Sequence, residues 1–144
     1  MFIDVKIDHE SSYLRTYRAV DRQEFSLDIT ITRVSNSTLD VGFHRCDSSR
    51  EKLKISDTRR VIMTIISALR DTLMSKNQMT DKLTAQEIQI QLNVLYGPKA
   101  HNRVIMYKRL VDKYVPILSK SNLVPYTHVK TDVTSGSVVI FIKR

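Results

Sequence analysis

Residues 25–32 read FSLDITIT, in which apolar and polar side chains alternate without a break. Successive side chains of a strand point to opposite faces of a sheet, so this period of two predicts a strand with one buried face. The turn-forming run SNS follows at 35–37, and the alternation resumes in LDVGFH at 39–44. Together the two segments predict an antiparallel hairpin.

On the N-terminal side of this hairpin, residues 2–7 (FIDVKI) alternate in the same way and predict another strand. The residues between them, 9–23, are compatible with a short helix and with a strand. The pattern therefore leaves the structure of residues 13–20 open.

A helix is predicted on the C-terminal side of the hairpin. Ser56 and Asp57 supply side-chain oxygens of the kind that cap a helix N-terminus. Beyond them, apolar side chains recur at spacings of four, three and four residues, at Ile62, Ile66, Leu69 and Leu73. This spacing matches the α-helical period and predicts one broad face packed on the sheet, with the helix ending near residues 76–77.

A strand and a second helix are predicted next. Residues 88–94 (IQIQLNV) alternate strictly, and Gly97 and Pro98 stop the strand. The buried stripe of the helix that follows is predicted to comprise Val104, Tyr107, Val111, Tyr114 and Leu118. Because Pro116 removes a backbone donor and clashes with the preceding turn, the helix either ends near Tyr114 or kinks before Ile117.

The last predicted element is a second hairpin, with residues 126–133 and 138–142 on either side of TSGS at 134–137. The order of elements is then strand, undetermined segment, hairpin, helix, strand, helix, hairpin. This order predicts an α+β fold in which two main helices pack on a mostly antiparallel sheet. No internal repeat or long linker divides the chain, so residues 1–144 are expected to form one domain.

Composition bounds the protein class. The chain has 144 residues, of which 42% are hydrophobic and 26% charged, as in an ordinary globular domain. Its single cysteine, Cys46, cannot form an internal disulfide. The longest apolar run, VIMTII at 61–66, is about a third of the ~20 residues that cross a bilayer, and residues 1–8 lack a secretory pattern. A cytoplasmic protein without a membrane span is expected.

Several kinds of chemistry are not indicated. The four histidines are far apart in sequence, and His44 and Cys46 lack the second ligand pair that a metal site needs. Phosphate-binding loops are rich in glycine, whereas Gly42, Gly97 and Gly136 lie about forty or more residues apart. We therefore predict no catalytic residues, no metal and no cofactor.

The excess of positive charge lies in the second half of the chain. Residues 1–72 carry twelve basic and eleven acidic side chains, whereas residues 73–144 carry eleven basic and only four acidic ones. An uncompensated cationic surface favours phosphates and other anionic partners. Basic side chains at helical spacing, with Lys130 on the strand that follows, predict a nucleic-acid-binding site. This site comprises Lys99, Arg103, Lys108, Arg109, Lys113, Lys120 and Lys130.

Two features qualify this site. Tyr126 and His128 lie beside Lys130 in sequence and are expected to add stacking, as aromatic side chains do in single-strand binders. If the helix ends at Pro116, Lys120 leaves the stripe. The alternative interpretation of the stripe is a solvated face of an amphipathic helix.

Residues 87–114 carry a family resemblance. Asn102 precedes a helix that contains Tyr107, and this unit resembles the last strand and helix of the GNAT N-acetyltransferases. In that family an asparagine and a tyrosine serve acetyl-CoA and the leaving thiolate. Here Asn102 and Tyr107 are five residues apart instead of the usual seven, and residues 56–60 lack the glycine of the family's pyrophosphate loop. The resemblance therefore implies a GNAT-like topology without the cofactor chemistry.

Three functions are compatible with the sequence. The leading hypothesis is a small non-enzymatic basic protein that contacts nucleic acid or another polyanion through its C-terminal half. The second is a protein–protein module, a phage virion or assembly component or an inhibitor of a host factor, that uses exposed sheet edges or the apolar tyrosine region. The chain resembles small accessory proteins of tailed phages, so a phage-encoded protein is expected under the leading hypothesis as well. The third is a degenerate GNAT-like acetyltransferase. A homo-oligomer is compatible with each of them.

Overall fold

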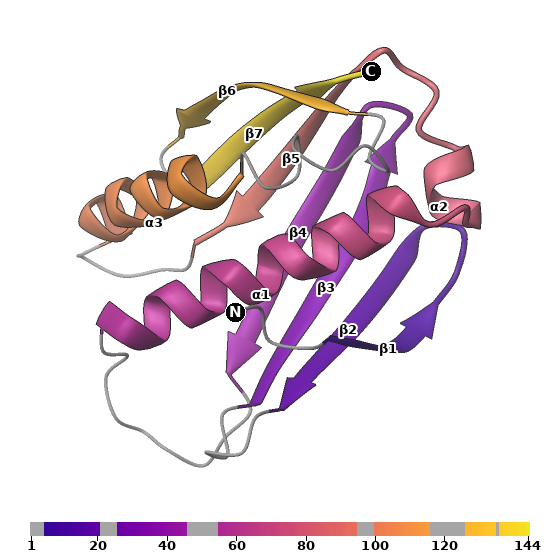
Figure 1. The fold of residues 1–144 in the computed structure, drawn as a ribbon. Helices are drawn as coiled ribbons and strands as arrows, with labels where there is room; N and C mark the ends of the chain where they lie inside the picture. The colour runs from indigo at the N-terminus through magenta and orange to yellow at the C-terminus, as the bar shows by residue number, and fades with distance from the viewer. Residues whose placement is uncertain (1–4, 21–25, 46–54, 95–99, 116–125, 135) are drawn as a thin grey trace.

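The computed structural model describes residues 5–20, 26–45, 55–94, 100–115, 126–134 and 136–144 (Figure 1). Within these ranges the protein is α+β, with one seven-stranded, mostly antiparallel sheet and three helices. The elements are β1 (Lys6–Glu10), β2 (Leu14–Val20), β3 (Ser26–Ser35), β4 (Thr38–Arg45), α1 (Ile55–Met74), α2 (Gln78–Asp81), β5 (Glu87–Asn93), α3 (Ala100–Tyr114), β6 (Thr127–Val133) and β7 (Ser137–Lys143).

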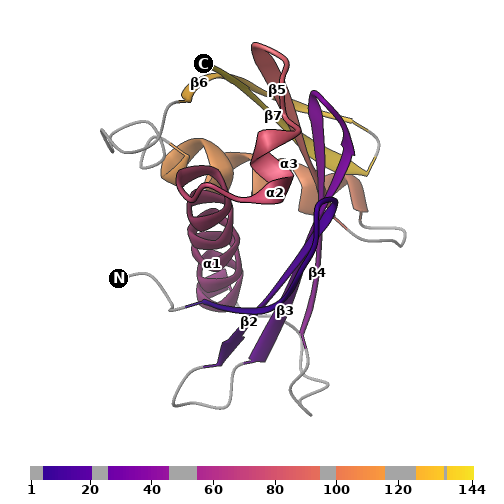
Figure 2. The ribbon, with the colours of Figure 1, turned by 90° about the vertical axis from the view of Figure 1, so that its right-hand side faces the viewer.

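The strands are ordered β1-β2-β3-β4-β5-β7-β6 across the sheet. All neighbours are antiparallel except β4 and β5, which run parallel because α1 returns the chain to the starting end of the sheet. Figure 2 shows α1 on one side of β2, β3 and β4. Helices α1 and α3 contact each other, and their apolar side chains share one core with the sheet.

The hairpin predicted at residues 25–44 is confirmed as β3 and β4, which pair antiparallel. Leu27, Ile29 and Ile31 are buried, and Ile31 lies opposite the buried Val41 of β4. The polar residues between them face the other side of the sheet, as the alternation requires. The strands predicted from residues 88–94 and the C-terminal hairpin are present as β5 and as β6 with β7.

The N-terminal segment differs from the expectation. Of the strand predicted at residues 2–7, only 5–7 are described, and 6 and 7 belong to β1, which extends from Lys6 to Glu10 with all five residues exposed. Residues 1–4 lie outside the described part of the chain. The segment left open at 13–20 forms β2, which follows a turn closed by hydrogen bonds from the Leu14 amide to Ser11 Oγ (3.1 Å) and from the Ser11 amide to the Leu14 carbonyl (2.7 Å).

Helix α1 buries the predicted apolar stripe. Ile62, Ile66 and Leu69 are fully buried, and Leu73 nearly so. The helix begins at Ile55, so the residues expected to cap it, 56–57, belong to its first turn. Three threonines are also buried in this helix, at positions 58, 64 and 72.

The second predicted helix, α3, ends at Tyr114, the first of the two alternatives left open by the sequence. Proline at position 116 explains this end, because it lacks the backbone donor that the next turn needs and disfavours helical backbone at residue 115. Val104, Tyr107 and Val111 form the buried side of the helix. Leu118 and Lys120 lie outside the described residues. No helix in the described part of the chain has the length and apolar character needed to cross a membrane.

Candidate functional site

The predicted basic residues are divided between two elements. Lys108, Arg109 and Lys113 lie on α3. Lys130 lies on β6. The backbone of Arg103 belongs to α3, but its side chain, like residues 99 and 120, is not among the described parts of the molecule. The positions of Lys99 and Lys120 therefore stay predictions.

The outer face of α3 carries the exposed cations. Arg109 and Lys113 are both exposed and lie one helical turn apart. Lys108 donates to the carboxylate of Asp112 across one turn, with Nζ and Oδ2 2.7 Å apart. Asp112 is the only acidic residue in the α3 sequence. Because Lys108 engages Asp112, the positive charges of Arg109 and Lys113 are not offset by a carboxylate of their own helix.

Lys130 lies on the opposite side of the sheet from α3. It pairs with Phe141 of β7, between Ile140 and Ile142, which belong to the core shared with the helices. Its Nζ is 4.7 Å from the centroid of the Phe141 ring and 3.2 Å from Oδ2 of Asp132. The structure thus brings Arg109 and Lys113 together but does not bring Lys130 to them.

The two side chains expected to provide stacking make internal contacts. Tyr126 is 5% exposed, and its hydroxyl accepts hydrogen bonds from the guanidinium of Arg144 at 3.1 and 3.3 Å. His128 Nε2 lies 2.8 Å from Oγ1 of Thr131 on the same strand. Both side chains are therefore engaged by other residues of the protein, and they do not lie beside Lys130 as exposed rings on which a base could stack.

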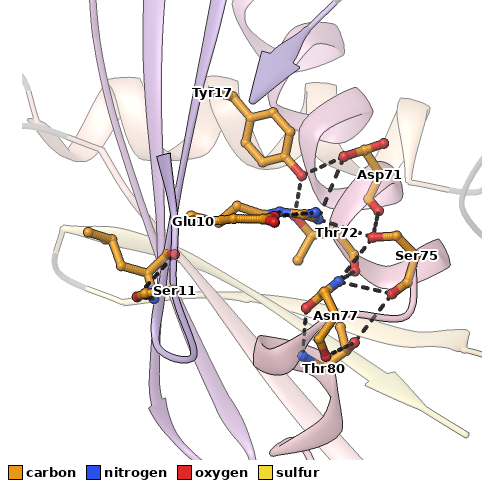
Figure 3. Close-up of polar contacts among 10 residues, drawn as sticks. Glu10, Ser11, Tyr17, Asp71, Thr72, Ser75, Asn77 and Thr80 are labelled. Atoms are coloured by element: carbon orange, nitrogen blue, oxygen red, sulfur yellow. Dashed lines mark hydrogen bonds and ion pairs between the residues drawn. The ribbon is translucent and has the colours of Figure 1, made fainter. Parts of the chain in front are cut away.

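A buried polar cluster that the sequence did not reveal joins β2 to the end of α1 (Figure 3). Its centre is Arg15, 5% exposed, whose guanidinium donates to Glu10 Oε2 at 3.0 and 3.2 Å and to Ser75 Oγ at 3.1 Å. A carboxylate oxygen of Asp71 lies 3.6 Å from the same guanidinium. A charge this deeply buried is stable only when paired and hydrogen-bonded, and these contacts supply both.

Tyr17 extends the cluster along β2. Its hydroxyl donates to Asp71 Oδ2 at 2.7 Å and lies 2.8 Å from Oγ1 of Thr72 (Figure 3). Because the single phenolic proton points to Asp71, the Thr72 hydroxyl is the donor in the second bond. Burial, and to a smaller degree the Asp71 carboxylate, raises the pKa of the Tyr17 hydroxyl above its ordinary value. Tyr17 is therefore a neutral donor at every physiological pH.

The cluster ends at the junction of α1 and α2. Asn77 caps α2 by accepting from the Thr80 amide at 2.9 Å, and its amide nitrogen donates to the carbonyls of Thr72 and Ser75 at 2.9 Å each. A cavity of about 230 Å³ lies beside it, lined by Glu10, Ser11, Arg15, Lys76, Asn77, Gln78 and Met79. Protein groups already hold the Arg15 guanidinium, and the cluster connects β2 to α1.

The pairing of β4 with β5 covers only part of β4. Their parallel pairing ends at Val41 and Leu92, although β4 continues to Arg45. A Cβ placed on Gly42 would meet no atom within 4 Å on the face of the sheet that this residue presents. Phe43 packs edge-on against Tyr107 of α3, with ring centroids 6.0 Å apart. This end of β4 is thus in contact with the helix that carries the basic face.

No cluster of three or more metal-ligating side chains occurs in the described ranges. The chain matches no protein-family model and no curated protein, and its fold matches no solved structure. The fold and the charges define a small basic α+β protein, and its function is inferred from the surfaces described above.

Proposed function

We propose that this protein is a non-enzymatic binding protein that contacts the phosphate backbone of nucleic acid through the outer face of α3. The observation that carries the proposal is the exposed pair Arg109 and Lys113, one turn apart, on a helix whose only carboxylate is engaged by Lys108. Arg103 lies on the same helix and adds a further positive charge.

The proposed contact does not read base sequence. Arginine and lysine on an exposed helix face bind phosphates electrostatically, which provides affinity and register but little discrimination between bases. Tyr126 and His128 are held by Arg144 and Thr131, so the proposal assigns them no stacking role. Lys130 stands on the other side of the sheet and is likewise outside the proposed interface.

The test is the salt dependence of binding to a fluorescently labelled single-stranded oligonucleotide. Each phosphate contact contributes about −0.7 to the slope of log K against log salt concentration. The double variant Arg109→Gln/Lys113→Gln should lower the magnitude of that slope by about 1.4. A matched control, Lys130→Gln/Lys143→Gln, removes the same charge from two exposed side chains of β6 and β7.

The control should keep the slope of the unmodified protein. Equal losses in both variants would show that net charge, and not the α3 face, determines binding. No measurable binding by the unmodified protein at low salt would refute the proposal entirely. A retained protein partner after nuclease treatment of a host lysate would favour the protein–protein module instead.

A second candidate is a GNAT-like topology that binds a coenzyme A thioester, favoured by the early end of the β4–β5 pairing. Beyond Val41, no other strand in the described residues pairs with this side of β4, and in this candidate its backbone groups there would bind an extended, amide-bearing chain such as pantetheine. Calorimetric titration with acetyl-CoA tests this, with adenosine 3′,5′-bisphosphate as the control for simple anion binding. Equal affinity for both compounds, or no heat at millimolar acetyl-CoA, would remove the candidate.

A further inference from the structure

The sheet has two outer edges, and they differ in their protection against pairing. Along β1 every residue except Ile7 is ionisable. Charged side chains and bulges at an edge discourage the addition of another strand. A register shift between Ile7 and His9 interrupts the same strand. The β1 edge therefore has features that discourage pairing with a strand of another chain.

The β6 edge also has a register shift, between His128 and Lys130, but it exposes two apolar side chains where β1 exposes one. Val129 and Val133 are 55% and 39% exposed, and they lie on either side of Thr131, which is buried. Strand β6 pairs with β7 on one side, and no strand among the described residues pairs with its outer side. Two exposed branched apolar side chains on an edge that no described strand covers favour the addition of a strand.

The sequence of β6 is complementary to itself in one antiparallel register. With a two-fold axis at Thr131, Lys130 lies opposite Asp132 of a second copy, and Val129 lies opposite Val133 of that copy. With the axis at Lys130, that lysine would instead oppose itself. Opposite charges and apolar pairs across strands stabilise a sheet, and like charges destabilise it. Charge complementarity thus selects the first register.

We propose that the β6 edge is a homodimer interface, in which the β6 strands of two copies pair antiparallel about Thr131. Lys130 and Asp132 of one chain are already 3.2 Å apart and more than half exposed. In the dimer each carboxylate lies between a lysine of its own chain and one of the second copy. The same patch of each copy forms the contact, as a closed two-fold dimer requires.

The dimer would have a functional consequence. The two-fold axis of an antiparallel strand pair is perpendicular to the sheet, so both helical layers lie on the same side of the joined sheets. The α3 faces of both copies then point to one side, and two sets of Arg109 and Lys113 become available to one extended polyanion. The dimer itself does not depend on that function.

The test is a charge-swap experiment, read by sedimentation equilibrium. The unmodified protein should approach twice the 16.7 kDa chain mass at micromolar concentration. Lys130→Asp and Asp132→Lys each place like charges opposite one another in the dimer, so each variant alone should be monomeric. Mixed in equal amounts, the two variants restore both opposite-charge pairs and should form a heterodimer.

Mixing the variants distinguishes a contact between two copies from a stabilising ion pair within one chain. Both variants lose the ion pair within the chain, and mixing cannot restore that pair. Lys6→Asp, on the β1 edge, is the matched control and should stay dimeric. A monomeric unmodified protein at 100 μM, or variants that do not combine on mixing, would overturn the proposal. Dimers that persist in both single variants would place the interface elsewhere.

Discussion

Replacing Tyr17 by phenylalanine tests whether the buried polar cluster stabilises the fold. The ring of Tyr17 is 1% exposed, so Tyr17→Phe removes one oxygen atom and leaves the packing of the ring intact. The lost oxygen donates to Asp71 at 2.7 Å and contacts the Thr72 hydroxyl at 2.8 Å. These two bonds connect β2 directly to α1.

The expected loss of unfolding free energy depends on how Asp71 and Thr72 are hydrogen-bonded once the Tyr17 hydroxyl is removed. A hydrogen bond to a charged group contributes about 1.5–3 kcal/mol, and one between neutral groups about 0.5–1.5 kcal/mol. The Asp71 side chain is 48% exposed and can be hydrated, and the Thr72 hydroxyl can turn to a carbonyl one turn earlier in α1. We therefore expect a loss of about 2 kcal/mol, below the sum of the two bonds.

Urea unfolding and calorimetry measure this loss. A destabilisation of about 2 kcal/mol should lower Tm by about 4–8 °C in a domain of this size, and the urea dependence of the unfolding free energy should be unchanged. Tyr13→Phe is the matched control, because Tyr13 is 56% exposed. If Tyr17→Phe is as stable as the Tyr13→Phe control, the cluster contributes nothing and this reasoning is wrong.

Two further predictions concern the same region. Because burial raises the pKa of Tyr17, the folded chain keeps a proton that the unfolded chain loses near pH 10, so this contribution to stability is complete below pH ~10 and declines above it. The difference in unfolding free energy between the unmodified protein and Tyr17→Phe, measured in urea, should shrink between pH 9 and 11; a constant difference would contradict this. Asn77→Ala removes the cap of α2 and two bonds to carbonyls, and should cost about 1–2 kcal/mol in urea unfolding, whereas Asn77→Ser, which keeps a capping oxygen, should cost less. Equal stability of the two variants would show that the cap is unimportant.

The elements that the sequence predicted are those whose signal is local. Strand β3 alternates from Ser26 to Thr32, and α3 ends where Pro116 prevents another turn, so neighbours in sequence suffice to specify them. Strand β2 was not predicted, because a buried position on it is occupied by Arg15. Besides the nearby Glu10, the partners that make this residue compatible with the core are Asp71 and Ser75, more than fifty positions later.

In the candidate site, too, some features follow from the sequence and others only from the tertiary structure. The sequence alone determined that the second half of the chain is basic and that Arg109 and Lys113 share the side of a helix away from its apolar stripe. The position of Lys130 was decided by tertiary structure. Thr127 pairs with Lys143, but a bulge between His128 and Lys130 adds one residue to the strand and reverses the alternation. This one added residue turns Lys130 away from the core side and from α3, and it arises from pairing with β7, which residue order alone does not encode.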